Sequence, residues 1–184
     1  MLKLFTSLLL LTAASAAPVK DSQALTKRWG CWGPAPSSWD VQNAINTWQT
    51  DINVVNAFLN NAPSDPTALY WAAQTALTAA SNENGPFKVL AAICDLQLPD
   101  GSDGYSRAVN AIQTSLPAVV AKLQDVVNSP ADPNRVGAVA STDLCCQVLP
   151  SVDFLFCQAT ANYGIKDQVP NWVARPNACE NVNC

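Results

Sequence analysis

Residues 37–59, SSWDVQNAINTWQTDINVVNAFL, decide the fold class. Large apolar side chains at positions 41, 45, 48, 52, 55 and 59 follow one another at intervals of four, three, four, three and four residues. That spacing places them on one face of an α-helix. Ser37 or Ser38 can cap this helix, and Asp40 stands three residues after Ser37, as in a capping box. Asn60-Asn61-Ala62-Pro63 predicts its end.

A second helix is expected to begin at Asp65-Pro66, where an N-cap residue precedes a proline at the first helical position. Its packing face is rich in alanine, which lets a neighbouring helix approach closely. Residues 81–85 predict a break, after which Pro86 restarts a short helix.

Two further helical regions follow a Gly- and Asp-rich loop. Residues 105–126 repeat the apolar interval of the first helix, but they include Pro117, which predicts a kink or a split into two helices. Residues 134–162 predict a last helical region that Pro150 interrupts and that Gly164 caps. Residues 165–184 have no period and are expected to be irregular.

No stretch alternates convincingly with a period of two residues, so strands are not required. The two long apolar stripes have to be buried against neighbouring helices, and each large apolar side chain contributes about 1.5–3 kcal/mol. The sequence therefore predicts an all-α fold, an antiparallel bundle of four or five helices braced by disulfides.

The first 28 residues have the features of export and processing signals. Lys3, an apolar run over 4–11 and Ala14-Ser15-Ala16 form the pattern of a secretory signal peptide cleaved after Ala16. The run is too short to span a bilayer, so no transmembrane segment is expected. Lys27-Arg28 resembles the site of a kexin-type protease, the alternative being an exposed, uncut linker. We expect a signal peptide (1–16), a pro-segment (17–28) and one secreted, extracellular helical domain (29–184).

Few charges remain after this processing. The chain has ten basic and fourteen acidic residues, of which 1–28 holds four and one, leaving six and thirteen and a net charge of −7. The basic residues are scattered singly, which argues against nucleic acid and anionic membranes as partners. The remaining surface has to be built largely from Asn, Gln, Ser and Thr.

The cysteines agree with export to an oxidising compartment, where structural disulfides are the expected use. The seven are Cys31, Cys94, Cys145, Cys146, Cys157, Cys179 and Cys184. An odd number leaves one thiol, either buried or joining two chains, so we expect a monomer or a disulfide-linked dimer. Cys145 and Cys146 point about 100° apart on a helix and should have different partners. We expect bridges that pin the chain ends, with Cys31, Cys179 and Cys184, onto the helical body.

Catalytic and metal-binding patterns are sparse. The chain has no histidine and no C-x-x-C pair, which removes the usual nucleophile–base and zinc sites. Asp100 and Asp103 share a loop that lacks the pattern of a calcium site, so Asp103 is interpreted as a helix cap. We therefore predict no catalytic residue, no metal, no cofactor and no enzymatic activity; a hydrolase with an unrecognised acid pair is the less favoured alternative.

The tryptophans gather near the start of the predicted domain. Trp48 lies on the first helical stripe and is predicted to be core. Trp29 and Trp32 flank Cys31 in a Gly- and Pro-rich segment. They either cover one end of the bundle, which we favour, or form an exposed apolar or sugar-stacking patch.

Two stretches resemble small secreted, cysteine-containing helical proteins of filamentous fungi. They are Trp48-x-x-Asp51-Ile52-x-x-Val55-Asn56-x-Phe58-Leu59 and Cys145-Cys146-x-Val148-Leu149-Pro150. The helix layout over 38–163 is also distantly similar to the hydrophobic surface-binding protein A group, secreted helical proteins that adsorb to apolar surfaces. The seven cysteines depart from the pattern of that group, and neither resemblance implies catalytic residues.

These observations favour a secreted, non-enzymatic protein that acts at a host or surface interface. Its partner would be a host protein, a cell wall or an apolar surface, as for an effector that contributes to virulence. The alternative is a carrier or adsorber of apolar ligands, with a cavity opening between the helices at Pro117 and the Ala-rich second helix. Ordinary tight packing at these two places is the simpler expectation.

Overall fold

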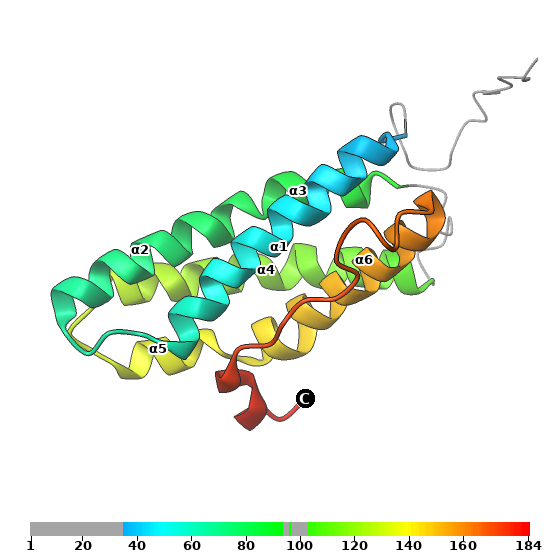
Figure 1. Cartoon of the computed structure of the whole chain (residues 1–184). Helices are drawn as coiled ribbons and strands as arrows, with labels where there is room; N and C mark the ends of the chain where they lie inside the picture. The colour runs from blue at the N-terminus through cyan, green and yellow to red at the C-terminus, as the bar shows by residue number, and fades with distance from the viewer. Residues whose placement is uncertain (1–34, 94–95, 97–102) are drawn as a thin grey trace, which may run out of the picture.

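The computed structural model describes residues 35–93, 96 and 103–184, which contain helices and no β-strand. The elements in chain order are α1 (Ser38–Asn60), α2 (Pro66–Asn82), α3 (Asn84–Ala91), α4 (Gly104–Asn128), α5 (Asn134–Val139), the π-helical segment η2 (Asp143–Val148), α6 (Leu149–Tyr163) and the 3₁₀ turn η3 (Asn177–Asn181). Figure 1 shows the long helices lying alongside one another, with the chain end crossing them. The all-α prediction is confirmed for these residues.

The first helix forms as its sequence predicts. The Asp40 backbone N–H donates to Ser37 Oγ (3.1 Å) and the Ser37 N–H donates to Asp40 Oδ2 (2.9 Å), which completes the capping box. The Ser37 hydroxyl also donates to Asp40 Oδ2 (2.6 Å), and this bond, together with the one from the Ser37 N–H, holds the pKa of Asp40 below its usual value. All six large residues of the predicted stripe are buried, and Trp48 is fully enclosed. The prediction that Trp48 is a core residue is therefore confirmed.

The second helix packs between α1 and α4. Asp65 caps it, because the Ala68 N–H donates to Asp65 Oδ1 at 2.8 Å. Ala73 and Ala76 are fully buried, and their small side chains let the neighbouring helix axes come close. The predicted packing face of α2 is confirmed.

The predicted break over residues 81–85 is wrong in its extent. α2 continues to Asn82 and α3 begins at Asn84, so only Glu83 separates them. Gly85 and Pro86 lie in the first turn of α3, where a proline is tolerated because its missing N–H would have no intrahelical partner. The short link places Glu83 at the joint between two helices.

A split of the fourth helix at Pro117 is also wrong, because α4 is continuous from Gly104 to Asn128. Asp103 caps it as predicted, accepting a 2.8 Å hydrogen bond from the Ser106 N–H. Leu116 and Val119, on either side of the proline, are buried in the core. Their packing holds the helix together while Pro117 itself faces outward.

The last helical region is interrupted earlier than predicted. α5 ends at Val139, and the π-helical segment η2 precedes α6. Pro150 lies in the first turn of α6 and does not interrupt it, so that expectation is wrong. Pro150 cannot donate to the carbonyl four residues earlier, and the wider π-helical turn lies where this bond is missing. Gly164 ends α6 in the left-handed region, with φ 66°, as predicted.

Residues 165–184, called the strap below, run back over α1 and α6 (Figure 1). The strap is irregular apart from η3, as predicted. Asn56 Nδ2 on α1 donates to the Ala174 carbonyl (2.8 Å), and the Asn177 N–H donates to Asn60 Oδ1 (2.7 Å). Three apolar strap side chains are buried beneath it: Ile165, Val169 and Val173.

Two disulfides fasten the end of the strap to η2. They join Cys145 to Cys179 and Cys146 to Cys184. The predictions that the adjacent cysteines have different partners and that the chain end is pinned to the helical body are confirmed. Cys157 on α6 is a free, exposed thiol. Cys31 and Cys94 lie outside the described residues.

Candidate functional site

A groove of about 580 Å³ opens between the α2–α3 junction and the middle of α4. Six apolar side chains contribute to its walls: Ala80, Phe87, Ile112, Leu116, Pro117 and Val120. Pro117 is one of the exposed residues of α4 and lies on the groove wall. It has no N–H to donate to the Gln113 carbonyl four residues earlier, and both residues line the groove. A volume of this size is within the range of small-molecule sites, about 300–1,000 Å³.

The rim of the groove is polar and carries one positive charge. Ser81, Asn84, Lys88 and Gln113 surround the apolar walls. Lys88 is exposed and makes no salt bridge with another described residue. This arrangement can hold an apolar molecule and hydrogen-bond or ion-pair a polar group at its end.

Behind this junction lies a buried carboxyl group. Glu83 is only 4% exposed, and its Oε2 accepts a hydrogen bond of 2.9 Å from Trp48 Nε1. Burial raises the pKa of Glu83 to about 8, the Trp48 hydrogen bond lowers it, and the nearby Asp51 charge raises it. Burial also raises the pKa of Asp51. With a pKa of about 8, this core carboxyl group is mostly protonated at pH 7.

A serine and a lysine approach each other at the start of η2. Lys122 Nζ lies 2.8 Å from Ser141 Oγ and 2.7 Å from Asp143 Oδ2. A catalytic Ser–Lys pair needs a neutral amine that accepts the serine proton. Here Lys122 also forms a salt bridge with Asp143, and its contacts with Ser141 and Asp143 link α4 to the start of η2.

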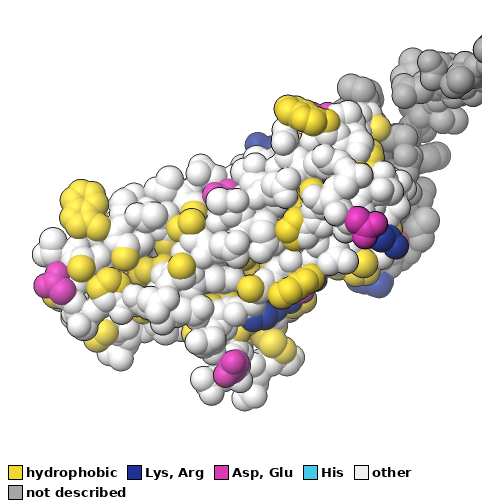
Figure 2. Space-filling model, in the orientation of Figure 1, with side chains coloured by type: hydrophobic (Ala, Val, Ile, Leu, Met, Phe, Trp, Pro, Cys, Tyr) yellow, Lys and Arg dark blue, Asp and Glu magenta, His cyan; other side chains and the backbone are white. Residues whose placement is uncertain are grey.

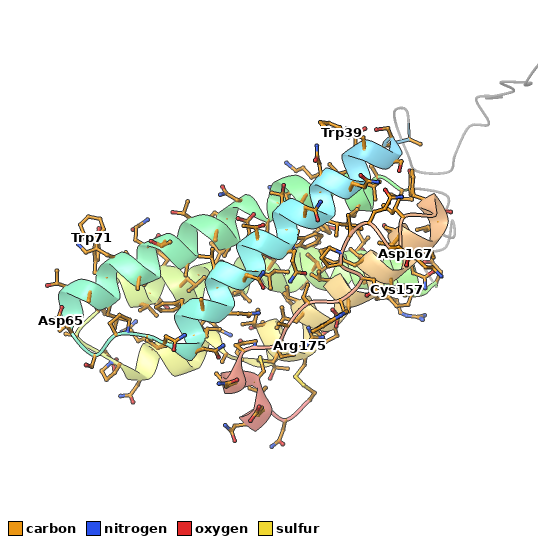
Figure 3. All side chains as sticks on the ribbon, viewed as in Figure 1. Trp39, Asp65, Trp71, Cys157, Asp167 and Arg175 are labelled. Carbon is orange, nitrogen blue, oxygen red and sulfur yellow. A yellow bond between two sulfur atoms is a disulfide. The ribbon has the colours of Figure 1, made fainter. Side chains whose placement is uncertain are left out.

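Three of the four described tryptophans are exposed, although tryptophan is usually well buried. Trp39, Trp71 and Trp172 are 68%, 63% and 64% exposed. In Figure 3, Trp39 and Trp71 project from the same side of the molecule, near opposite ends of its long axis. Figure 2 shows that charged side chains are isolated patches on this largely uncharged face.

Several predicted site residues lie outside the described part of the chain. They are Ala16, Lys27, Arg28, Trp29, Trp32, Cys31 and Cys94. The expected aromatic patch at Trp29 and Trp32 therefore stays a prediction. The exposed tryptophans among the described residues are ones that the sequence analysis does not single out. Glu83 is also missed by the sequence analysis, because this residue is not part of a periodic pattern of apolar side chains that would predict its burial.

One described segment has the length and apolarity of a membrane span. It is Asn134–Tyr163, and half of its most apolar window is buried inside the fold. A core helix meets the same criterion, so this is weak evidence for a span. Within the described ranges, no group of three Cys, Asp or Glu side chains is placed to hold a metal ion.

Comparison with protein-family models, curated proteins and solved structures finds no match for this chain. The resemblances given by the sequence therefore stay expectations.

Proposed function

We propose that this chain is a secreted, non-enzymatic protein that acts at an interface outside the cell, in the manner of an effector. The long helices lie alongside one another, and we interpret their arrangement as an antiparallel bundle. The two disulfides are compatible with an extracellular location. The signal peptide, the pro-segment, the role in virulence and the likeness to secreted fungal proteins belong to this proposal.

The observation that carries the proposal is the exposure of Trp39 and Trp71 on one side of a surface where charged side chains are sparse. Tryptophan offers a large apolar area and an N–H donor, and it is enriched where proteins bind partners. Tyr70 packs edge-on against Trp71, with ring centroids 5.0 Å apart, which restricts the indole before binding. A restricted anchor loses less conformational entropy when it meets a surface.

The test is adsorption of the processed protein to alkyl-coated silica and to insoluble cell-wall glycan. Replacing both anchors, W39A and W71A, should weaken binding by at least roughly tenfold, as expected for aromatic hot spots. The matched control is T75A, which changes an exposed residue one turn after Trp71. Equal binding by the double variant, or no binding by the unaltered protein to either material, would contradict the proposal.

A second function is favoured by the groove beside Pro117. It would make the protein a carrier of small apolar molecules that bear a polar group, with the tail against Ile112, Leu116 and Val120 and the polar group at Lys88. The support is the coincidence of apolar walls, a polar rim and a suitable volume. This combination is typical of ligand pockets.

Native mass spectrometry of the protein secreted by its own cells tests the carrier function directly, because a retained ligand adds its mass. V120D places a charge on the groove wall and should weaken binding of that ligand by roughly tenfold. T114D adds the same charge to an exposed position of α4 outside the groove and is the control. A protein that carries no ligand and binds no apolar probe would exclude the carrier function and leave the interface function standing.

A further inference from the structure

A small cavity lies in the core where α1, the α2–α3 junction, α4, η2 and the start of α6 meet. Its volume is about 10 Å³, and seven of its nine lining residues are apolar. The other two are Asn56 and Glu83, which are only 6% and 4% exposed. A space of this size is close to what one water molecule requires.

The two polar residues leave hydrogen-bonding capacity inside this cavity. Asn56 Nδ2 donates to the Ala174 carbonyl of the strap at 2.8 Å, which fixes the orientation of the amide. Asn56 Oδ1 is then a buried acceptor with no partner among the described residues. Glu83 donates no described hydrogen bond, while its Oε2 accepts from Trp48 Nε1. An unpaired buried acceptor is costly, so native cores usually satisfy it with a protein group or a water.

We propose that this cavity binds one water molecule that joins the Glu83 carboxyl group to Asn56. The water accepts a hydrogen bond from the Glu83 O–H and donates one to Asn56 Oδ1. Because burial raises the pKa of Glu83 to about 8, the carboxyl group holds its proton at neutral pH and can donate. Two polar partners are enough to retain a buried water.

The water completes a chain of hydrogen bonds through three parts of the protein. It runs from the Trp48 indole to Glu83 at the α2–α3 joint, through the water to Asn56 on α1, and on to Ala174 of the strap. The strap is therefore linked to the helix joint by polar contacts as well as to η2 by its disulfides. Asn56 has the central position, because it binds the water and the strap with the two ends of one amide.

The first test is a crystal structure of the disulfide-intact protein at a resolution that orders single waters, near pH 6. We expect one water within about 2.6–3.2 Å of both a Glu83 carboxyl oxygen and Asn56 Oδ1. A dry cavity, or a direct hydrogen bond between Glu83 and Asn56, would overturn the proposal.

The second test counts long-lived internal waters in solution by ¹⁷O magnetic relaxation dispersion. V148I adds a methyl group to one wall of the cavity and should remove one such water, while leaving both polar residues in place. Displacing the water should also raise the unfolding equilibrium constant, by roughly tenfold, because Asn56 Oδ1 loses its partner. V55I enlarges another wall and replaces V148I if that variant does not fold.

The two possible contents of the cavity predict opposite results for these variants. In a dry cavity the added methyl fills empty space, so the water count stays the same and the unfolding constant falls. An unchanged water count in V148I or V55I would therefore refute the proposal. The loss of one water from the filled variant would support it.

Discussion

Glu83 makes stability depend on pH in a direction that can be worked out from the structure. Its pKa is about 8 in the folded protein and 4.5 in the unfolded chain. Between these two values the folded state holds a proton that the unfolded state has lost, so the free energy of unfolding falls as pH rises. The contribution is fully present below about pH 4.5 and is lost by about pH 8.

The size of this loss follows from the same two pKa values. One pKa unit corresponds to about 1.4 kcal/mol, so raising the pH from 4.5 to 8 should lower the free energy of unfolding by roughly 4 kcal/mol. The variant E83Q cannot ionise, but its side-chain oxygen can still accept the Trp48 Nε1–H bond. It should match the unaltered protein within about 1 kcal/mol near pH 4.5 and be more stable by roughly 3 kcal/mol near pH 8.

The assay is urea unfolding of the disulfide-intact protein, followed by tryptophan fluorescence at half-unit steps from pH 4.5 to 8.5. E180Q is the matched control, because it makes the same chemical change on the exposed η3 turn and should keep the pH dependence. The reasoning is refuted if the unaltered protein keeps constant stability across this range. It is also refuted if E83Q retains the full slope.

Three other changes test the contact to Glu83, the disulfides of the strap and the free thiol. Replacing Trp48 with phenylalanine removes the donor to Glu83, so W48F should lower the free energy of unfolding by about 1–3 kcal/mol. It should also raise the pKa of Glu83 further, so the fall in stability with pH should extend to higher pH. The pair C179S and C184S frees the strap and should lower the unfolding free energy by about 2–5 kcal/mol per bridge, and unchanged stability would exclude a bracing role. C157S should change stability by less than about 0.5 kcal/mol, because the thiol is exposed, and it should remove a covalent dimer that forms through this thiol, as non-reducing electrophoresis would show.

The features that could be predicted from the sequence are those that depend on local pattern. The α1 stripe and the caps at Ser37, Asp65 and Asp103 depend on residues within one or two turns of each other, and all are confirmed. The split that is expected at Pro117 does not occur, because the local penalty of the proline is outweighed by the packing of Leu116 and its neighbours in the core. In such cases tertiary contacts override the preference of a single residue.

The candidate sites depend on contacts between distant segments, for which the sequence carries little signal. Asn56 is one of several asparagines on α1, and its burial follows from the strap, whose Ala174 it binds across 118 positions of sequence. Glu83 does not belong to a periodic pattern of apolar residues that could indicate burial. Its environment forms only when α1 packs against the α2–α3 joint. The groove lies at Pro117, one of the two places where the sequence predicts that a cavity can open, because a proline within a helix leaves a local irregularity.

The charges and the buried acid together define the conditions that suit this protein. The salt bridges among the described residues are those of Lys122, Arg135 and Arg175, and all are partly exposed, so each contributes little and salt should weaken the fold only slightly. The chain has no histidine, which is the side chain whose ordinary pKa lies between pH 5 and 8. Glu83 is then the main group that binds a proton more tightly in the folded protein than in the unfolded chain in this range. Its contribution to the free energy of unfolding therefore increases as the pH falls. We therefore expect the fold to be more stable near pH 5 than near pH 8, which is compatible with the proposed role outside the cell.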